Sequence, residues 1–302
     1  MPIQQITIVG TGLIGGSLGL ALRRSGLAGR IVGCDTRAVL EVAHRRGAID
    51  RAEADLERAI IGSDLIVIAT PVGRAVAQLE ALAHLVPPEV LITDSGSTKQ
   101  NFAERARMLF GKDAPQRVLP GHPMAGKEVG GIEHADAGLF SDAVWLITPV
   151  EMGQEYTRRQ QEYLELLGAI GARVITLDAE RHDHLCAWIS HLPQMIATAL
   201  ACSLREEFGD DEELMPIGGR ALREMTRIAH SPYSMWRDIA LTNTGNIEHA
   251  LLRFEQQLAH LRENLRGPGM REMFESAGQW SVASGQLPVV PRAPRAVKKS
   301  ED

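Results

Sequence analysis

Apolar runs and amphipathic helical patterns alternate along the first part of the chain. The run IQQITIV (3–9) leads into the glycine turn GTGLIGGS and then into the helical stretch LGLALRRSG. Later apolar runs, each followed by a helical pattern, read RIVGCD, SDLIVIATP and EVLITDSGS. Short apolar runs that end at turn residues are typical of buried strands. The alternation predicts an α/β fold, in which a doubly wound parallel sheet carries helices on both faces.

The pattern changes after Asp178. Before it, the runs RVLPGHP, AVWLITP and ARVITL predict three later strands. Beyond it no convincing strand pattern appears and helical periodicity dominates. We therefore place a boundary near residue 176, with a first domain at 1–176 and an all-helical C-terminal domain at 177–285. The proline-rich, mixed-charge tail 286–302 is expected to be disordered.

The helical half contains one continuous helical pattern of roughly 30 residues between Ser234 and Arg266, against an average helix length of ~10–14 residues. A core helix is one interpretation. We also expect this helix to pack against a second copy of the chain, because the small domain offers little else to bury it. The pattern thus favours a homodimer formed through the helical domain.

Composition excludes several classes of protein. The net charge of −6 over 302 residues argues against a protein that coats nucleic acid or an anionic membrane. Cys34, Cys186 and Cys202 form no CxxC pair, which is typical of a reduced intracellular protein. The N-terminus lacks the basic segment of a signal peptide, and no apolar run approaches the ~18–20 residues of a membrane span. We expect a cytoplasmic protein without nucleic-acid or membrane partners.

The glycine turn after the first strand has the spacing G-x-G-x-x-G and opens a helix. In that context the first glycine permits the tight turn, the second lets the backbone approach a pyrophosphate, and the third lets helix and strand pack closely. The helix N-terminus then offers free N–H groups to the phosphates. A glycine-rich turn without a ligand is the alternative. The first domain is thus expected to be a Rossmann-type dinucleotide-binding domain, with cofactor contacts from Gly10, Thr11, Gly12, Leu13, Ile14 and Gly15.

An acidic residue, Asp35, ends the second predicted strand, 20 residues after Gly15. A carboxylate there accepts hydrogen bonds from the ribose hydroxyls and repels a 2′-phosphate, so it favours NAD over NADP. Arg37 follows two residues later and can soften that preference. Thr70 and Pro71, after the third apolar run, are expected to border the cofactor or simply to end the strand.

Two loops are expected to reach the same cleft, since ligands of open α/β sheets bind outside the carboxyl ends of the strands. The loop GHPMAGKE carries His122, whose backbone is held extended by the following proline. A histidine titrates near pH 6.5, which suits a general base that removes an alcohol proton as hydride leaves carbon. The loop DSGSTK carries Ser97, a candidate catalytic hydroxyl. The alternatives are a structural histidine and a helix-capping serine.

The helical half contributes further candidates. His182, His184 and His191 suggest a metal cluster, but no carboxylate or cysteine completes a convincing ligand set, and we expect no metal. His191 precedes Leu192 and Pro193, where a proline is expected to kink the helix and aim the imidazole into a cleft.

Arg227 lies in an otherwise apolar helical stretch, MTRIAHSPYSMW. If it is partly buried, its guanidinium needs an anion, and a substrate carboxylate matches its planar fork. A surface arginine is the alternative.

The motifs VGTGLIGGS, TDSGSTK, GHPMAGKE, SHLP and MTRIAHSPYSMWRDI occur in this order. Together they resemble the prephenate/arogenate dehydrogenases of tyrosine biosynthesis over roughly residues 4–265. The resemblance implies oxidative decarboxylation of a cyclohexadienol, with NAD or NADP as the hydride acceptor. It implies that His122 is the catalytic histidine, that Ser97 shares its contact with the ring hydroxyl, and that Arg227 holds a substrate carboxylate. The residues that it places around the pocket are Glu128, His191, Ser231 and Trp236.

One departure concerns the substrate side chain. Many prephenate-using relatives have a second histidine in SHLPH, where this chain has Gln194. Asp142 is a candidate partner for the ammonium group of arogenate, with a loop aspartate as the alternative. We leave the substrate open between prephenate and arogenate and lean towards prephenate.

Two other functions fit parts of the pattern. Another Rossmann-plus-helical reductase, such as a β-hydroxyacid dehydrogenase or an imine reductase, is one. The first of these usually places a catalytic lysine in the helical domain, and this chain has no lysine between residues 178 and 297. A sensor that binds NAD without turnover is the other, and it would not need His122, Ser97 and Arg227 together.

Overall fold

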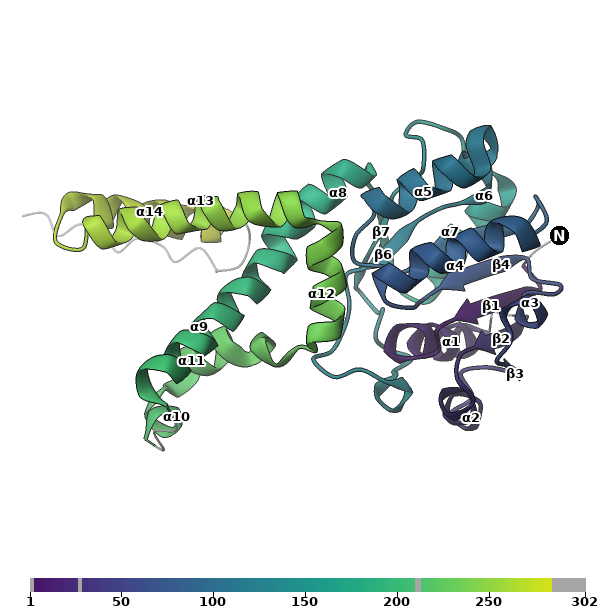
Figure 1. The fold of residues 1–302 in the computed structure, drawn as a ribbon, viewed down its shortest axis with the longest axis horizontal. Coiled ribbons are helices and arrows are strands. Elements are labelled where there is room, and N and C mark those ends of the chain that lie inside the picture. Colours follow the sequence, from purple (N-terminus) through teal and green to yellow (C-terminus); the bar gives the residue numbers. More distant parts are fainter. Residues whose placement is uncertain (1–2, 27–28, 210–212, 284–302) are drawn as a thin grey trace, which may run out of the picture. The chain divides into compact units, whose positions relative to one another are not determined.

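The computed structural model describes residues 3–26, 29–209 and 213–283 (Figure 1). The chain divides into two compact units, Met1–Glu248 and His249–Asp302. All of the candidate site residues lie in the first unit. The predicted tail 286–302 lies outside the described residues.

A five-stranded parallel sheet forms the centre of the first unit, in the order β3-β2-β1-β4-β5. Its strands are β1 (Gln5–Val9), β2 (Arg30–Cys34), β3 (Arg51–Glu53), β4 (Leu65–Ile68) and β5 (Leu91–Asp94). The chain moves outward from β1 to β3 and then crosses to β4, so the strand order reverses between β1 and β4. Ligands of such sheets bind at this switch point, outside the carboxyl ends of the strands. The predicted α/β fold class is confirmed.

Helices cover both faces of this sheet, as Figure 1 shows. The strand residues alternate between two cores, with Ile6 and Ile8 in one and Ile66 and Ile68 in the other. The first core contains side chains from α1 (Leu13–Ser25), α2 (Arg37–Arg45) and α7 (Arg158–Ala169). The second contains side chains from α3 (Leu56–Ala59), α4 (Val72–Leu85) and α5 (Gln100–Phe110).

The three later strands do not extend this sheet but form a second one, in the order β6-β7-β8. They are β6 (Gly121–Pro123), β7 (Val144–Ile147) and β8 (Arg173–Thr176). The expectation of one parallel sheet is wrong for them, because β6 pairs antiparallel with β7. Parallel neighbours need a crossover, usually a helix. Only the β7–β8 connection contains one, α7, and that pair is parallel. Short turns complete this region, namely η1 (Gly111–Asp113), α6 (Ala114–Arg117) and η2 (Ile132–His134).

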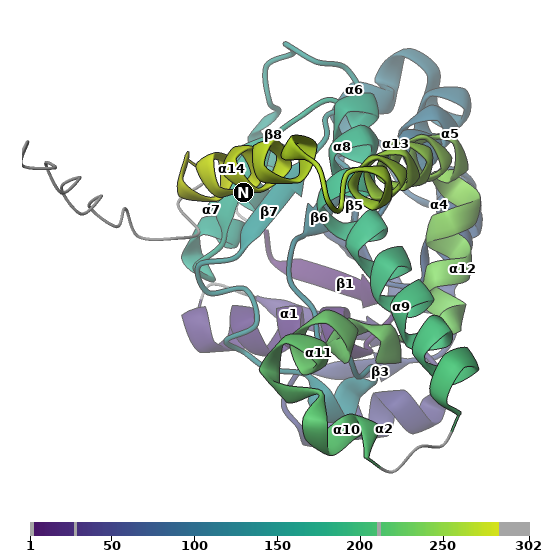
Figure 2. The same cartoon turned by 90° about the vertical axis from the view of Figure 1, so that its left-hand side faces the viewer.

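The helical part begins with a continuous run that is visible in Figures 1 and 2. It consists of α8 (Ala179–Cys186), a π-helical turn (Ala187–His191) and α9 (Leu192–Phe208). The wider π-helical turn lies directly before Pro193, the residue at which the sequence predicts a kink. By length and composition this 30-residue run is apolar enough to cross a membrane, contrary to the sequence expectation. The core helix of a soluble protein passes the same test, and this run carries four buried polar side chains, namely His182, Asp183, His191 and Gln194.

The remaining helical elements of the first unit lead back to the sheet. They are α10 (Leu214–Ile217), α11 (Gly219–Thr226), a 3₁₀ turn (Arg227–His230) and α12 (Tyr233–Thr242). α12 packs against α4. There the Gly73 N–H donates to the carboxylate of Asp238, at 3.3 Å.

The single helix expected between Ser234 and Arg266 is broken at Asn243. This residue leaves the helical conformation, with φ −132° and ψ 29°. Its buried amide donates to the backbone oxygen of Asp183, at 2.8 Å. A tertiary hydrogen bond of this kind is not visible in a periodicity pattern, and it ends α12 before α13 (Thr244–Glu263) begins.

The second unit consists of most of α13 and α14 (Pro268–Ala283). Several large apolar side chains on it are exposed to solvent in the single chain. Phe274 and Trp280 are each 64% exposed, and Leu252 and Leu258 are about half exposed. Exposed apolar groups of this size commonly mark a protein–protein contact.

The glycine turn generates a prediction about stability. A Cβ atom on Gly15 would lie 1.9 Å from the backbone oxygen of Gly10, so Gly15→Ala forces the helix away from the strand. We expect it to lower the free energy of unfolding by about 1–3 kcal/mol, measured by urea denaturation. Gly168→Ala is the matched control, since nothing lies within 4 Å of that helical position. Equal stability of the two variants would contradict the assigned packing.

Candidate active site

The glycine turn has the geometry that a dinucleotide pyrophosphate requires. Gly10 has φ +93°, and its N–H donates to the Cys34 carbonyl oxygen on β2 at 2.8 Å. The space beside Gly12 is open, with nothing within 4 Å of a Cβ placed there. Gly12 also begins α1 without a side-chain cap. The first N–H groups of α1, on Leu13 and Ile14, therefore have no capping side chain and suit an anion.

A hollow of about 420 Å³ lies at the carboxyl ends of the parallel strands. Three predicted cofactor residues line it, namely Gly10, Asp35 and Thr70. The Asp35 carboxylate is held by the backbone N–H groups of Thr11 at 2.8 Å and Thr36 at 2.7 Å. Each oxygen keeps a lone pair for a ribose hydroxyl. The uncapped N–H groups at the start of α1, the open space beside Gly12 and the Asp35 carboxylate together fit a dinucleotide.

The structure separates one predicted cofactor residue from this hollow. Arg37 lines a neighbouring cavity of about 690 Å³ instead. The arginine that lines the hollow is Arg74, in the first turn of α4, which sequence reasoning missed because no motif marks it. Thr70 donates to Gln78 at 2.6 Å, and Pro71 begins α4.

A buried ion pair fixes the strand that carries His122. Lys99 Nζ pairs with the carboxylate of Asp94, at the end of β5, and donates to the Gly121 oxygen at 2.8 Å. The other Asp94 oxygen accepts from the Gly121 N–H at 3.2 Å. Burial raises the pKa of Asp94 and lowers that of Lys99, while the contact between them opposes both shifts. His122 therefore lies at the carboxyl edge of the sheet.

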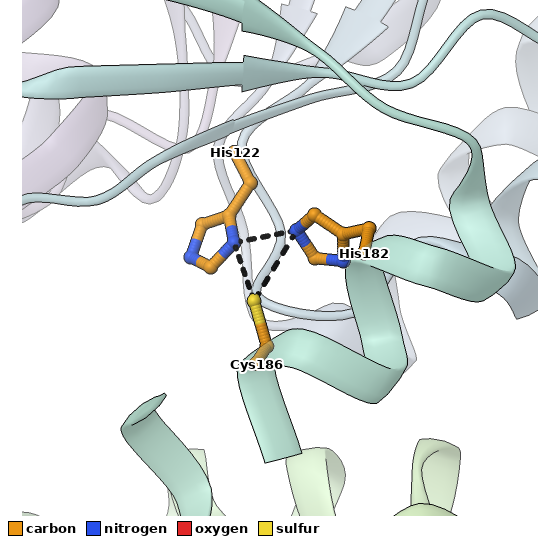
Figure 3. A group of neighbouring side chains, drawn as sticks. All are labelled: His122, His182 and Cys186. Atoms are coloured by element: carbon orange, nitrogen blue, oxygen red, sulfur yellow. Dashed lines mark hydrogen bonds between the residues drawn. The ribbon is translucent and has the colours of Figure 1, made fainter. Parts of the chain in front are cut away.

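His122 contacts two side chains of α8 (Figure 3). Its Nδ1 lies 2.9 Å from Nε2 of His182. Nδ1 of His182 lies 2.7 Å from Oδ1 of Asp183. The thiol of Cys186, one helical turn after His182, lies 3.6 Å from the same Nε2. His122, His182 and Cys186 are all buried.

The spacing within this group is that of hydrogen bonds. Two nitrogen ligands of a tetrahedral zinc ion lie about 3.3 Å apart, given Zn–N bonds of about 2.0–2.1 Å, which exceeds the 2.9 Å seen between His122 and His182. Burial raises the pKa of the Cys186 thiol to about 12, which keeps it protonated. Burial also lowers the pKa of His122 well below its ordinary value, and lowers that of His182. Both imidazoles are therefore neutral near pH 7.

Ser97 lies in the loop between Asp94 and α5, half-buried and two residues before Lys99. It does not cap α5. The carboxylate of Asp183 takes that place, accepting from the N–H groups of Lys99 at 2.7 Å and Gln100 at 2.9 Å.

His191 lies at the end of the π-helical turn and is buried. The Asn243 amide lies 3.2 Å from its Nδ1 and donates to it, because the same amide group also donates to a backbone carbonyl. Nε2 of His191 therefore carries the proton, and it is buried without a hydrogen-bond partner among the residues that the structure describes. Nε1 of Trp236, whose ring lies edge-on at 5.9 Å, is a second buried donor without a partner. Burial lowers the pKa of His191 to about 4.

The two predicted substrate-binding charges pair with each other. Arg227 forms an ion pair with Glu128, which follows His122 by six residues. Of the two interpretations of Arg227, the surface position is the one that the structure has, since its side chain is 63% exposed at the start of a 3₁₀ turn. The ion pair nevertheless brings the loop after His122 and the helical part to one place.

The other predicted residues have separate surroundings. Gln194 is buried one turn after His191 on α9, and its amide lies 3.3 Å from the Thr198 hydroxyl. The Ser231 hydroxyl donates within its own turn, at 2.9 Å. Asp142 adopts a left-handed turn with φ 61° before β7. It precedes Leu146, the register partner of His122, by four residues.

Sequence reasoning missed several residues of the cluster, namely Asp183, Cys186, Asn243, Lys99 and Asp94. The expectation that no cysteine joins the histidines is wrong, since Cys186 groups with His122 and His182 as a possible set of metal ligands. His182 was considered only as a metal ligand. The adjacent pair His182-Asp183 at the start of a helix was the available signal, because a carboxylate beside an imidazole commonly orients it.

Comparisons with known proteins identify the family of the chain. The family model described as "Prephenate dehydrogenase, nucleotide-binding domain" matches residues 18–176, and "Prephenate dehydrogenase, dimerization domain" matches residues 178–279. The chain is 32% identical to the prephenate dehydrogenase of Lactococcus lactis subsp. cremoris over 262 residues, which cover 86% of this chain and 70% of the relative.

Two solved structures have the same fold over nearly all of the chain. Prephenate dehydrogenase from A. aeolicus, in complex with hydroxyphenyl propionate and NAD⁺, has a TM-score of 0.84 at 28% identity, covering 95% of this chain and 99% of that one. Synechocystis arogenate dehydrogenase has a TM-score of 0.74 at 28% identity, covering 94% and 100%. With the glycine turn and the buried His122 at one sheet edge, these matches place this chain in the prephenate/arogenate dehydrogenase family, the NAD-dependent oxidoreductases of tyrosine biosynthesis.

Proposed function

We propose that this chain converts prephenate to 4-hydroxyphenylpyruvate, with His122 as the catalytic base and Arg227 as the anchor of a substrate carboxylate. The observation that supports this most is the buried imidazole of His122, held at the carboxyl edge of a sheet whose glycine turn fits a dinucleotide. Burial lowers the pKa of His122, which favours the neutral form that a base needs. When bound there, NAD supplies the hydride acceptor.

His122 and Ser97 have separate roles in the proposed reaction. His122 accepts the proton of the ring hydroxyl as hydride leaves C4, and the Ser97 hydroxyl shares that contact. Carbon dioxide then leaves and the ring becomes aromatic, and the proton held by His122 returns to the ring oxygen. Because aromatisation drives the second step, the protein mainly positions the reacting groups.

Arg227 is available to a substrate only through exchange of its partner. Its guanidinium now pairs with Glu128, so a substrate carboxylate must take the place of the Glu128 carboxylate. Both side chains are partly exposed, which keeps the cost of that exchange low. Arg227 then holds the acid, and Glu128 stays at the edge of the pocket.

The pocket donors favour prephenate over arogenate. His191 Nε2–H and Trp236 Nε1–H are buried donors without partners, and the keto acid of prephenate offers acceptors to them. The ammonium group of arogenate would instead need acceptors. Gln194 and Ser231 complete the expected pocket lining.

Turnover of the two acids tests this function. With NAD, we expect kcat/KM for prephenate to exceed that for arogenate at least tenfold, measured by NADH absorbance.

His122→Asn is expected to lower kcat by about 10²–10⁴-fold with little effect on NAD affinity. Arg227→Gln is expected to act mainly on KM for prephenate.

The alternative outcomes are distinct. A preference for arogenate would overturn the substrate assignment, and near-normal kcat in His122→Asn would overturn the base. NAD binding without NADH formation from either acid would indicate a sensor.

We infer that NAD is preferred over NADP because the Asp35 carboxylate lies in the hollow at the end of β2. Asp35→Asn removes the negative charge and keeps an oxygen for the backbone N–H groups of Thr11 and Thr36. We expect the ratio of kcat/KM for NADP to that for NAD to rise at least tenfold, helped by Arg74. An unchanged ratio would show that Asp35 does not select the cofactor.

We also propose a cytoplasmic homodimer that forms through the helical domain. The exposed Phe274 and Trp280 side chains support this, together with the match to a dimerization-domain model. Light scattering after size exclusion is expected to give twice the chain mass at micromolar concentration. Phe274→Asp/Trp280→Asp is expected to yield monomer, whereas Met108→Asp, an equally exposed apolar site on α5, leaves the dimer intact. A monomeric wild-type chain would contradict the proposal.

A further inference from the structure

We propose that His182 and Asp183 are positioning residues that hold His122 in one tautomer, with its proton on Nδ1 and its lone pair on Nε2. This inference deepens the proposed function and rests on it for its kinetic consequences. It is carried by the direction of each hydrogen bond in the chain from Asp183 through His182 to His122.

The direction of the chain is set at Asp183. Its two oxygens accept from the backbone N–H groups of Lys99 and Gln100, at 2.7 and 2.9 Å, in the first turn of α5. A carboxylate at a helix N-terminus is favoured in its ionised form. An ionised carboxylate is only an acceptor. Nδ1 of His182, 2.7 Å from Oδ1, must therefore be the donor.

The second link follows from the neutrality of His182. With its proton on Nδ1, a neutral imidazole has a lone pair on Nε2. Nδ1 of His122, at 2.9 Å, must then donate to that lone pair. The protonated thiol of Cys186, at 3.6 Å, approaches the same lone pair as a second, weaker donor.

The third link is the free nitrogen of His122. Because Nδ1 carries its single proton, Nε2 has the lone pair and serves as the base. The opposite tautomer would leave Nε2–H facing the substrate hydroxyl, which cannot accept the hydroxyl proton. Burial, followed by the neighbouring His182 and Lys99, opposes a second proton on His122 and so favours its neutral form.

The same chain acts during the reaction. When Nε2 takes the hydroxyl proton, His122 becomes an imidazolium, and its Nδ1–H bond to His182 becomes charge-assisted and stronger. The Asp183 carboxylate stabilises that charge through the intervening imidazole. The proton stays on His122 until it returns to the ring oxygen, so no net transfer along the chain is needed.

Variants of His182 separate this role from simple packing. His182→Leu removes the acceptor for His122, whereas His182→Gln keeps a carbonyl oxygen at a similar reach. We expect kcat for prephenate to fall about a hundredfold in His182→Leu and less than tenfold in His182→Gln, with KM for NAD within about threefold of wild type in both. His184→Leu, on the same helix and outside the cluster, is the matched control and is expected to leave kcat unchanged.

The tautomer itself is measured by long-range ¹H–¹⁵N NMR of the full chain labelled at histidine. We expect the His122 signals of the wild type to show a protonated Nδ1 and a bare Nε2, and this pattern to be lost in His182→Leu. A protonated Nε2 in the wild type would overturn the inference, as would a kcat for His182→Leu within threefold of wild type. If prephenate is not turned over at all, the proposed function fails, and the NMR pattern still decides the tautomer.

Discussion

One carboxylate, that of Asp183, connects the two halves of the site. It belongs to α8, yet it caps the first turn of α5 on the sheet side through two backbone N–H groups. It also receives the Nδ1 proton of His182. The group that docks the helical part against the sheet is therefore the group that orients the base. A shift of α8 along α5 would break both functions at once.

The same principle recurs at the neighbouring helix. Asp238 of α12 accepts from the N–H of Gly73 in the first turn of α4, so a second carboxylate of the helical part contacts a helix N-terminus of the sheet domain. Carboxylates complement the partial positive charge of helix N-termini. Between these two contacts, the buried Lys99–Asp94 pair fixes β6. Breaking a buried pair by removing one partner typically costs about 3–5 kcal/mol, which gives His122 a rigid support.

Local rules made part of this arrangement predictable. The glycine turn and Asp35 follow from backbone conformation and strand ends, and the structure has them in one hollow. His122 followed from the loop before Pro123 together with the family motifs.

What the sequence did not reveal depends on contacts between distant segments. Asn243 breaks an otherwise regular helical pattern to reach Asp183 and His191. The sequence left open whether Arg227 is buried or exposed, and it gave no sign that Arg227 pairs at the surface with Glu128. Periodicity reports which face of an element is buried, and it carries no information about which polar group meets which.

The central claim of the proposal is geometric, namely that His122 Nε2 faces the ring hydroxyl of the substrate beside the cofactor. A crystal structure of the full chain with NAD and 4-hydroxyphenylpyruvate tests it most directly. The account predicts the ring hydroxyl within hydrogen-bond distance of His122 Nε2 and the nicotinamide against the ring. A product ring bound away from His122, with the His122–His182 contact broken, would contradict it.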